Sequence, residues 1–222
     1  MKISEQLEIA ENLNSSSEVL AELAKSYKAM VRRKVAKHPN CSIVTQIYLS
    51  QDEDEQVRIE LGQNVNLSEE VQLKLSKDSD VVKQFLGENS RLALEIFDSL
   101  SEDQSKYVRA AIARNINCPI RIMDKLIRDT EEIVIEGLAG NISTPVELLE
   151  LIFQTGYESQ SLGGNPNTPI DILIELSEHG FNEIRQSVAG NPSAPKEILE
   201  ILIGDEDINV RNYAQENLEN RK

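Results

Sequence analysis

The sequence predicts an all-α fold, a right-handed α-solenoid of about eight two-helix repeats of about 26 residues. Three observations lead to this fold class: a recurring anchor residue, a helical pattern of apolar side chains on each side of it, and prolines at fixed places between the two patterns. The anchor recurs every 24–26 residues and is asparagine in eight of nine copies. The anchors are Asn12, His38, Asn64, Asn89, Asn115, Asn141, Asn165, Asn191 and Asn217.

The first helix of each repeat is predicted from the residues before the anchor. In eight of the nine copies a branched or long apolar residue lies three positions before it, and in eight Ala or Gly lies two positions before it; Val or Ile is frequent seven positions before it. Val31, Val35 and Ala36 are an example. These positions share one face of a helix. The small residue lets a second helix approach closely, so Leu138 and Ala139 are expected in the core.

The second helix is predicted from apolar residues 7, 8 and 11 positions after the anchor, such as Ile198, Leu199 and Leu202. Pro166 and Pro192 directly follow an anchor and should end the first helix. A proline four residues after the anchor suits the first turn of the second helix, and a threonine before it is expected to cap that helix. These residues are Pro119, Pro145, Pro169 and Pro195, with Thr144 and Thr168.

Composition sets the class of protein. The chain has 222 residues, of which 40% are apolar and 27% charged, as in a folded protein. No apolar run is long enough to cross a membrane, and the first residues lack the apolar core of a signal peptide, so a cytoplasmic location is expected. The repeats are expected to form a single domain over residues 1–222, with terminal caps at 1–16 and 205–222.

The charge of the chain favours some partners over others. The net charge is −15, with +2 over residues 1–50 and −17 over residues 51–222. A nucleic acid is disfavoured, because binding phosphates needs a surplus of Lys and Arg. The basic run at residues 32–38 is simplest to interpret as a solvated helix face. An acidic surface favours a basic protein partner through electrostatic steering.

The repeat pattern resembles a known family. The string VR–VA–NP–TP–LL–L–D is most regular over residues 184–211. It resembles the leucine-rich repeat variant family and, more distantly, HEAT-like repeats, and the resemblance covers nearly the whole chain. It implies an α-solenoid and says little about activity. Some relatives carry a cysteine-bound iron–sulfur cluster, but Cys41 and Cys118 form no cysteine cluster, so no cofactor is expected.

Charged residues recur with the repeat. A basic residue lies six positions before the anchor and an aspartate 14 positions after it, so each aspartate precedes the next basic position by five or six residues. Where the aspartate becomes Thr155, the basic residue becomes Ser159. This joint loss favours a structural ladder of paired charges; a functional row of cations is the alternative. The ladder comprises Asp52, Arg58, Asp78, Lys83, Asp103, Arg109, Asp205 and Arg211, and the same positions hold Arg32, Asp129 and Arg185.

No set of side chains indicates catalysis or metal binding. Cys41 and Cys118 lie three residues after an anchor, where other repeats have small residues such as Ala194, so they are expected to pack. His38 takes an anchor position and His179 an aspartate position, which favours local substitutions within the repeat. We therefore expect no catalytic, cofactor-binding or metal-binding residues.

These observations favour a non-enzymatic macromolecule-binding module that binds a protein, with no small-molecule substrate evident. Two alternatives remain. A HEAT-like DNA-repair glycosylase or other DNA-binding protein would need a basic groove and aromatic side chains to hold a base. A purely structural scaffold would need no partner.

By resemblance to HEAT-like stacks, the first helices should line the concave face with the residues five, four and one positions before each anchor. Phe85 is expected to be exposed there as a binding hot spot. Further along, small residues such as Gly137 and Gly140 either leave room for a partner's backbone or only allow tight curvature. The candidate partner-binding residues are Arg33, Lys34, Lys37, Glu60, Gln63, Gln84, Phe85 and Glu88, and the row also includes Ile59.

Overall fold

The structure is a computed structural model that describes residues 1–221 and divides into two compact units. Unit 1, Met1–Pro119, contains α1 (Ile3–Glu11), α2 (Ser17–Leu23), α3 (Ala29–Lys37), α4 (Ile43–Leu49), α5 (Glu55–Gly62), α6 (Glu69–Leu75), α7 (Asp80–Gly87), α8 (Leu94–Ser101) and α9 (Lys106–Arg114). Unit 2, from Ile120 onward, contains α10 (Ile120–Leu126), α11 (Glu132–Gly140), α12 (Val146–Gln154), α13 (Gln160–Gly164), α14 (Ile170–Ser177), α15 (Asn182–Gly190), α16 (Lys196–Leu202) and α17 (Ile208–Glu219).

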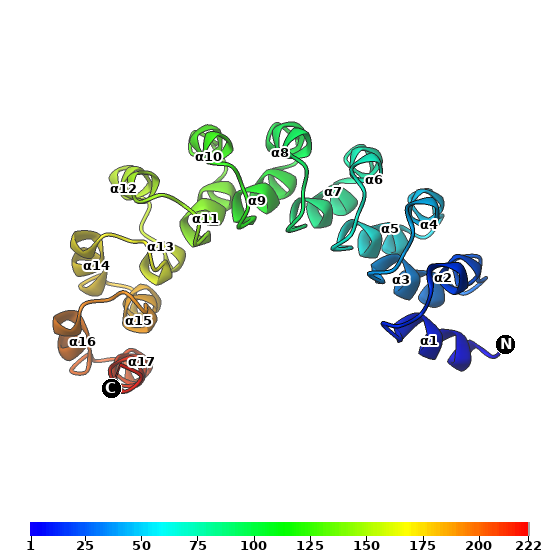
Figure 1. The fold of residues 1–222 in the computed structure, drawn as a ribbon. Helices are drawn as coiled ribbons and strands as arrows, with labels where there is room; N and C mark the ends of the chain where they lie inside the picture. The colour runs from blue at the N-terminus through cyan, green and yellow to red at the C-terminus, as the bar shows by residue number, and fades with distance from the viewer. Residues whose placement is uncertain (222) are drawn as a thin grey trace. The chain divides into compact units, whose positions relative to one another are not determined.

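Each unit is a stack of two-helix repeats. In unit 1 the odd-numbered helices pack in succession along the inner side of an arc, and α2, α4, α6 and α8 lie along the outer side (Figure 1). In unit 2 the helices α11, α13, α15 and α17 also pack in succession. Within residues 1–221 every regular element is a helix, so the all-α solenoid is confirmed. The single-domain assignment and its terminal caps remain a prediction.

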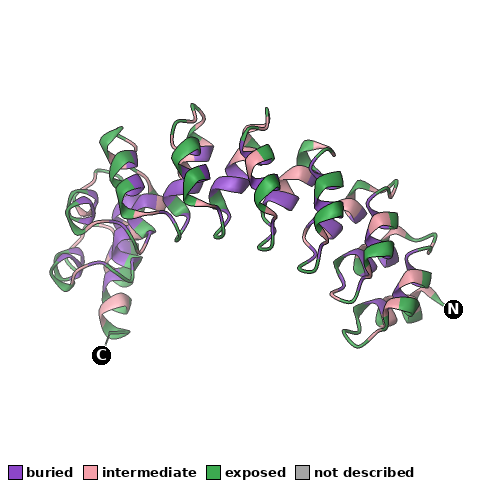
Figure 2. Cartoon of the chain, turned by 45° about the horizontal axis from the view of Figure 1, so that its top comes forward, coloured by how far each residue is buried: buried purple, intermediate pink, exposed green. Residues whose placement is uncertain are grey.

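The core lies where the apolar pattern predicts it. Val31, Val35 and Ala36 of α3 are fully buried, and so are Leu138 and Ala139 of α11. The second helices bury the predicted positions as well, for example Ile198, Leu199 and Leu202 of α16. Each helix therefore has one buried face and one exposed face (Figure 2). This pattern follows because neither helix of a repeat could bury its apolar side alone.

The anchor asparagines form a hydrogen-bonded ladder between repeats. Asn64 donates from Nδ2 to the backbone carbonyls of Ala36 (2.7 Å) and His38 (3.0 Å), and its Oδ1 accepts from the backbone N–H of Asn66 (2.8 Å). One amide thus bonds two carbonyls at the end of the preceding first helix, and the carbonyl of His38 also accepts from the backbone N–H of Cys41 at 3.0 Å. The same donation to the preceding repeat is made by Asn89, Asn115, Asn165, Asn191 and Asn217.

His38 reproduces the asparagine contacts with its ring. Nε2 lies 3.0 Å from the carbonyl oxygen of Asn12, and Nδ1 accepts from the backbone N–H of Asn40 at 3.0 Å. These two contacts require a neutral ring with hydrogen on Nε2, since a carbonyl accepts and an N–H donates. The anchor position therefore requires a side chain with one donor and one acceptor, and both asparagine and a neutral histidine meet this requirement.

The turn between the helices differs from the prediction at the threonines. Pro145, Pro169 and Pro195 are the N-cap residues of the second helices, with φ between −54° and −61°. Thr144 and Thr168 do not cap these helices: their hydroxyls donate to the backbone carbonyls six residues earlier, both at 2.6 Å. The proposed capping is wrong because both threonines are buried and turn back toward the first helix.

Candidate partner-binding surface

The ladder charges pair across neighbouring loops. Arg32 donates from Nε and Nη2 to the two carboxylate oxygens of Asp52 at 2.6 and 2.8 Å, and from Nη1 to the carbonyl of Ser26 at 2.9 Å. Each pair spans 20 residues, so the carboxylate does not pair with the basic residue five or six positions after it. That later residue instead reaches the aspartate's backbone carbonyl, as Arg58 does at Asp52 (2.7 Å). The same arrangement includes Arg58–Asp78, Lys83–Asp103 and Arg185–Asp205, and the backbone contacts of Arg109 to Asp103 and of Arg211 to Asp205.

These pairs are shielded from water and electrostatically strong. The Arg185 and Asp205 side chains are 9% and 8% exposed. The hydrogen bond from Arg185 holds the pKa of Asp205 below its ordinary range. A bidentate guanidinium–carboxylate pair fixes orientation as well as charge. The guanidinium groups of Arg32, Arg58 and Arg185 are thus already engaged with neighbouring loops.

The basic residues among the candidates in unit 1 are paired with acidic neighbours. Arg33 contacts Asp54 at 2.9 Å, and Lys34 contacts Glu11 at 2.7 Å. Lys37 lies 3.2 Å from Glu60. A notch of about 270 Å³ lies among these side chains, and its lining residues are Met30, Arg33, Lys34, Lys37 and Glu60. The Nε atom of Arg33 is buried without a hydrogen-bond partner, while its Nη2 bonds Asp54.

The remaining candidate residues lie on α5 and α7 beside this notch. Gln63, Gln84 and Phe85 are partly buried and Glu88 is exposed, so Phe85 is less open than expected. Ile59 does not face a groove: it is 5% exposed, because α5 is enclosed between α3 and α7. These candidates therefore share one row of helices, with Phe85 partly covered.

In unit 2 the small residues of this row are used in packing. A Cβ placed on Gly140 would lie 3.3 Å from Oγ of Ser161, and one on Gly190 would lie 3.4 Å from Cδ1 of Tyr213. Gly137, which was expected to face the groove, is buried. The glycines allow successive first helices to approach closely, which favours the packing interpretation over an open groove.

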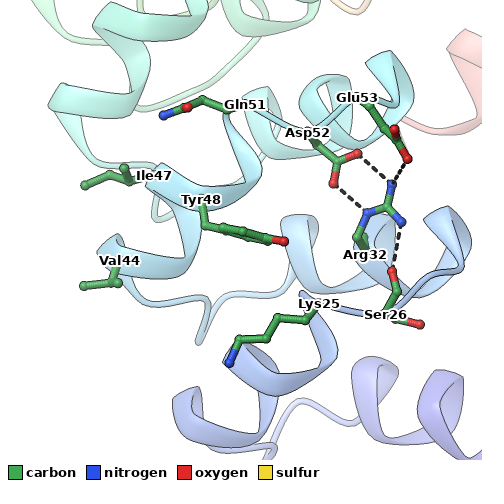
Figure 3. Close-up of a pocket in the computed structure, with 9 residues that line it drawn as sticks. All are labelled: Lys25, Ser26, Arg32, Val44, Ile47, Tyr48, Gln51, Asp52 and Glu53. Carbon is green, nitrogen blue, oxygen red and sulfur yellow. Dashed lines mark hydrogen bonds and ion pairs between the residues drawn. The ribbon is translucent and has the colours of Figure 1, made fainter.

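A cavity of about 700 Å³ lies between α2 and α4 in unit 1 (Figure 3). Val44, Ile47 and Tyr48 form one wall, and the opposite wall contains the Arg32–Asp52 pair. Because that guanidinium already contacts Asp52 and the carbonyl of Ser26, the Arg32–Asp52 pair in this cavity serves the ladder.

The cysteines and His179 are engaged locally. Cys41 and Cys118 are buried, and burial raises the pKa of the Cys41 thiol to about 12. His179 accepts at Nδ1 from the backbone N–H of Phe181 (3.0 Å), the contact that Asp52 makes with Asp54 in another repeat (2.9 Å). Over residues 1–221 no three His, Cys, Asp or Glu side chains are grouped to hold a metal ion. None of the helices described is long and apolar enough to cross a membrane.

Comparison with known proteins bears on the fold. No protein-family model matches the sequence, and no curated protein matches it. A solved structure described as a leucine-rich repeat variant with a novel repetitive structural motif is 20% identical, covers 96% of this chain and 86% of its own, and superposes with a TM-score of 0.56.

Designed repeat proteins also match, with lower similarity. A designed armadillo repeat protein is 18% identical over 96% of this chain and 98% of its own, with a TM-score of 0.30. One of a set of computationally designed armadillo repeat proteins for modular peptide recognition is 16% identical over 98% of this chain and 99% of its own, with a TM-score of 0.28. The solved leucine-rich repeat variant, with its TM-score of 0.56, confirms for the architecture the resemblance seen in the sequence: this chain is an α-solenoid similar to that protein.

Proposed function

We propose that this protein is a non-enzymatic module that binds a basic protein partner. The observation that carries the proposal is the distribution of charge. Residues 120–222 contain 19 Asp and Glu against 8 Lys and Arg. A surface with this excess of negative charge attracts basic partners and repels nucleic acids.

Within unit 1, the proposed contact surface is the row around the notch: Arg33, Lys34, Lys37, Glu60, Gln63, Gln84, Phe85 and Glu88. Two features support it. Arg33, Lys34, Lys37 and Glu60 line a notch that a side chain of a partner could enter. Phe85, a partly buried aromatic side chain among polar neighbours, has the character of a hot-spot residue.

The test begins with a pull-down from the native source, identification by mass spectrometry and titration calorimetry with the purified partner. We expect a partner of basic pI whose affinity falls with added salt. Phe85→Ala should weaken binding roughly 30-fold, as for a hot spot. The double reversal of Arg33 and Lys34 to Glu should weaken binding as well, because it replaces their ion pairs with Asp54 and Glu11 by repulsion and so disturbs the shape of the notch.

The control is Leu94→Ala, which removes an apolar side chain that is 64% exposed on α8, outside this row. Unchanged affinity in both unit 1 variants would place the contact elsewhere on the protein. A shift of duplex DNA at physiological ionic strength, with no protein partner recovered, would overturn the proposal.

A further inference from the structure

The charge ladder is interrupted in unit 2, next to a cleft. At the 20-residue spacing, Ile135 is matched with Thr155 and Ser159 with His179, so two successive pairs lack both charges. The cleft, of about 460 Å³, lies beside this interruption and is walled by α11, α13, α15 and the loop before α13. Its volume lies within the range of pockets that hold small ligands.

The cleft is lined by carboxylates that have no cationic partner. Glu136, Glu158 and Glu183 line it, and residues 129–184 contain no Lys or Arg but 11 Asp and Glu. Glu136 accepts hydrogen bonds from the hydroxyls of Tyr157 (2.8 Å) and Ser161, which are neutral donors. Across residues 1–221 no Lys or Arg pairs with any of the three carboxylates.

His179 does not supply the missing positive charge. Its Nδ1 accepts from the backbone N–H of Phe181, so the hydrogen of the ring lies on Nε2, which contacts Glu158 at 3.0 Å. The ring is neutral in this arrangement. The cleft therefore keeps an excess of negative charge.

Two aromatic rings stand among these carboxylates. Phe181 is 68% exposed, and its ring lies against that of His179 with centroids 5.3 Å apart. Tyr157 is partly buried, with its hydroxyl on Glu136. An exposed aromatic face next to carboxylates suits a planar organic cation, which can stack on the ring while its N–H groups bond the oxygens.

We propose that this cleft binds an arginine side chain of a basic protein partner. The inference rests on the proposed function, since the arginine would belong to that partner. The ladder offers an internal parallel, because Arg32, Arg58 and Arg185 each place a guanidinium between a carboxylate and a backbone carbonyl of neighbouring loops. Ser159 stands at the corresponding basic position here, so the guanidinium has to come from outside the repeat.

The test uses the full-length ¹⁵N-labelled chain and three capped tripeptides, Gly-X-Gly, where X is arginine, lysine or citrulline. Citrulline keeps the shape of arginine without its charge. We expect the arginine peptide to shift the amide resonances of Ser159, Ser161 and Glu183. The lysine peptide should bind more weakly, and the citrulline peptide should cause no saturable shift.

Three variants locate the site. Glu136→Gln keeps an acceptor for Tyr157 and removes the charge, and Phe181→Ala removes the ring; each should weaken binding roughly three- to tenfold. Glu150→Gln removes the same charge from an exposed position on α12 outside the cleft and should change affinity by less than about twofold. Circular dichroism verifies that each variant is folded.

Three results would overturn the inference: equal binding of the arginine and citrulline peptides, equal binding of the arginine and lysine peptides, or equal losses from Glu136→Gln and Glu150→Gln. The protein partner separates this inference from the proposed function. Undiminished partner binding by Glu136→Gln and Phe181→Ala would reject the cleft and leave the function standing. A cleft that binds the arginine peptide in a chain with no protein partner would reject the function.

Discussion

Replacing Asn165 with alanine tests whether the anchor ladder holds the repeats together. The Asn165 amide is 2% exposed and donates to the carbonyls of Ala139 (2.7 Å) and Asn141 (3.0 Å). Its Oδ1 accepts from the backbone N–H of Asn167 at 2.9 Å. Asn165→Ala removes all three hydrogen bonds. The carbonyl of Asn141 keeps its bond from the backbone N–H of Thr144 (2.9 Å), but the carbonyl of Ala139 loses its side-chain donor.

The expected loss is large because the partners are buried. Each hydrogen bond contributes about 1 kcal/mol, and each buried group left unpaired costs about 1–3 kcal/mol, so the free energy of unfolding should fall by roughly 3–5 kcal/mol. Asn165→Asp should cost at least as much, because it places a carboxylate opposite two carbonyl oxygens. In a stack where each repeat contacts only its neighbours, the loss should be greatest around α11 and α13.

Urea unfolding followed by far-ultraviolet circular dichroism measures the change, since the chain has no tryptophan. Native-state hydrogen exchange locates it along the chain. The matched control is Asn167→Ala, two residues away, whose exposed amide donates to the carbonyls of Ile142 and Thr144 and should contribute less than about 1 kcal/mol. Equal effects of the two substitutions, or a loss below about 1 kcal/mol for Asn165→Ala, would refute the reasoning.

Three further predictions follow from the repeat. Ala139→Arg should cost several kcal/mol, because it places an unpaired charge in a fully buried site, and a thermal unfolding midpoint equal to the parent's would contradict the assigned register. In urea denaturation, His38→Asn should keep the free energy of unfolding within about 1 kcal/mol of the parent's, whereas His38→Ala should lower it by about 2 kcal/mol. Equal values for the two variants would show that the ring contacts do not stabilise the fold. The lowered pKa of Asp205 stabilises the fold above about pH 4, and this contribution is lost as the pH falls through the lowered value. The stability difference between the parent and Asp205→Asn should therefore narrow in acid, and a constant difference from pH 7 to pH 2 would argue against the ion pair.

The sequence predicted the fold well because its repeat is regular in spacing and in apolar pattern. The anchor at Asn64 and the buried positions at Val35 and Ala36 needed no tertiary information beyond the requirement that each helix bury one face. The purpose of the anchor was not predictable in this way. Its amide bonds the backbone of the preceding repeat, 26 to 28 residues earlier, and such a contact depends on how successive turns stack.

The predicted ladder pairing assumed the wrong one of two possible spacings between the paired ladder residues. If each aspartate position is paired with the basic position six residues later, Asp129 is paired with Ile135 and His179 with Arg185. Each of these two pairs has only one charged member. At 20 residues, every matched pair has two charged members or none. The longer spacing was therefore readable from the sequence, although its physical reason, loops stacked along one edge, appears only in three dimensions.

The cleft residues were missed because they depart from the repeat instead of belonging to it. In a repeat protein, a side chain that recurs in every copy is explained by stacking, as the asparagines and ladder arginines show. Stacking does not explain the aromatic side chains of Tyr157 and Phe181, since the position that they share, two residues after the ladder aspartate, holds Glu131 and Asp207 in the flanking repeats. These departures coincide with the loss of two ladder pairs and with α13, which has only five residues. The segment around α13 lacks the structural ion pairs of the other repeats and instead contains carboxylates and aromatic rings. It is therefore the segment in which we expect a partner to be recognised.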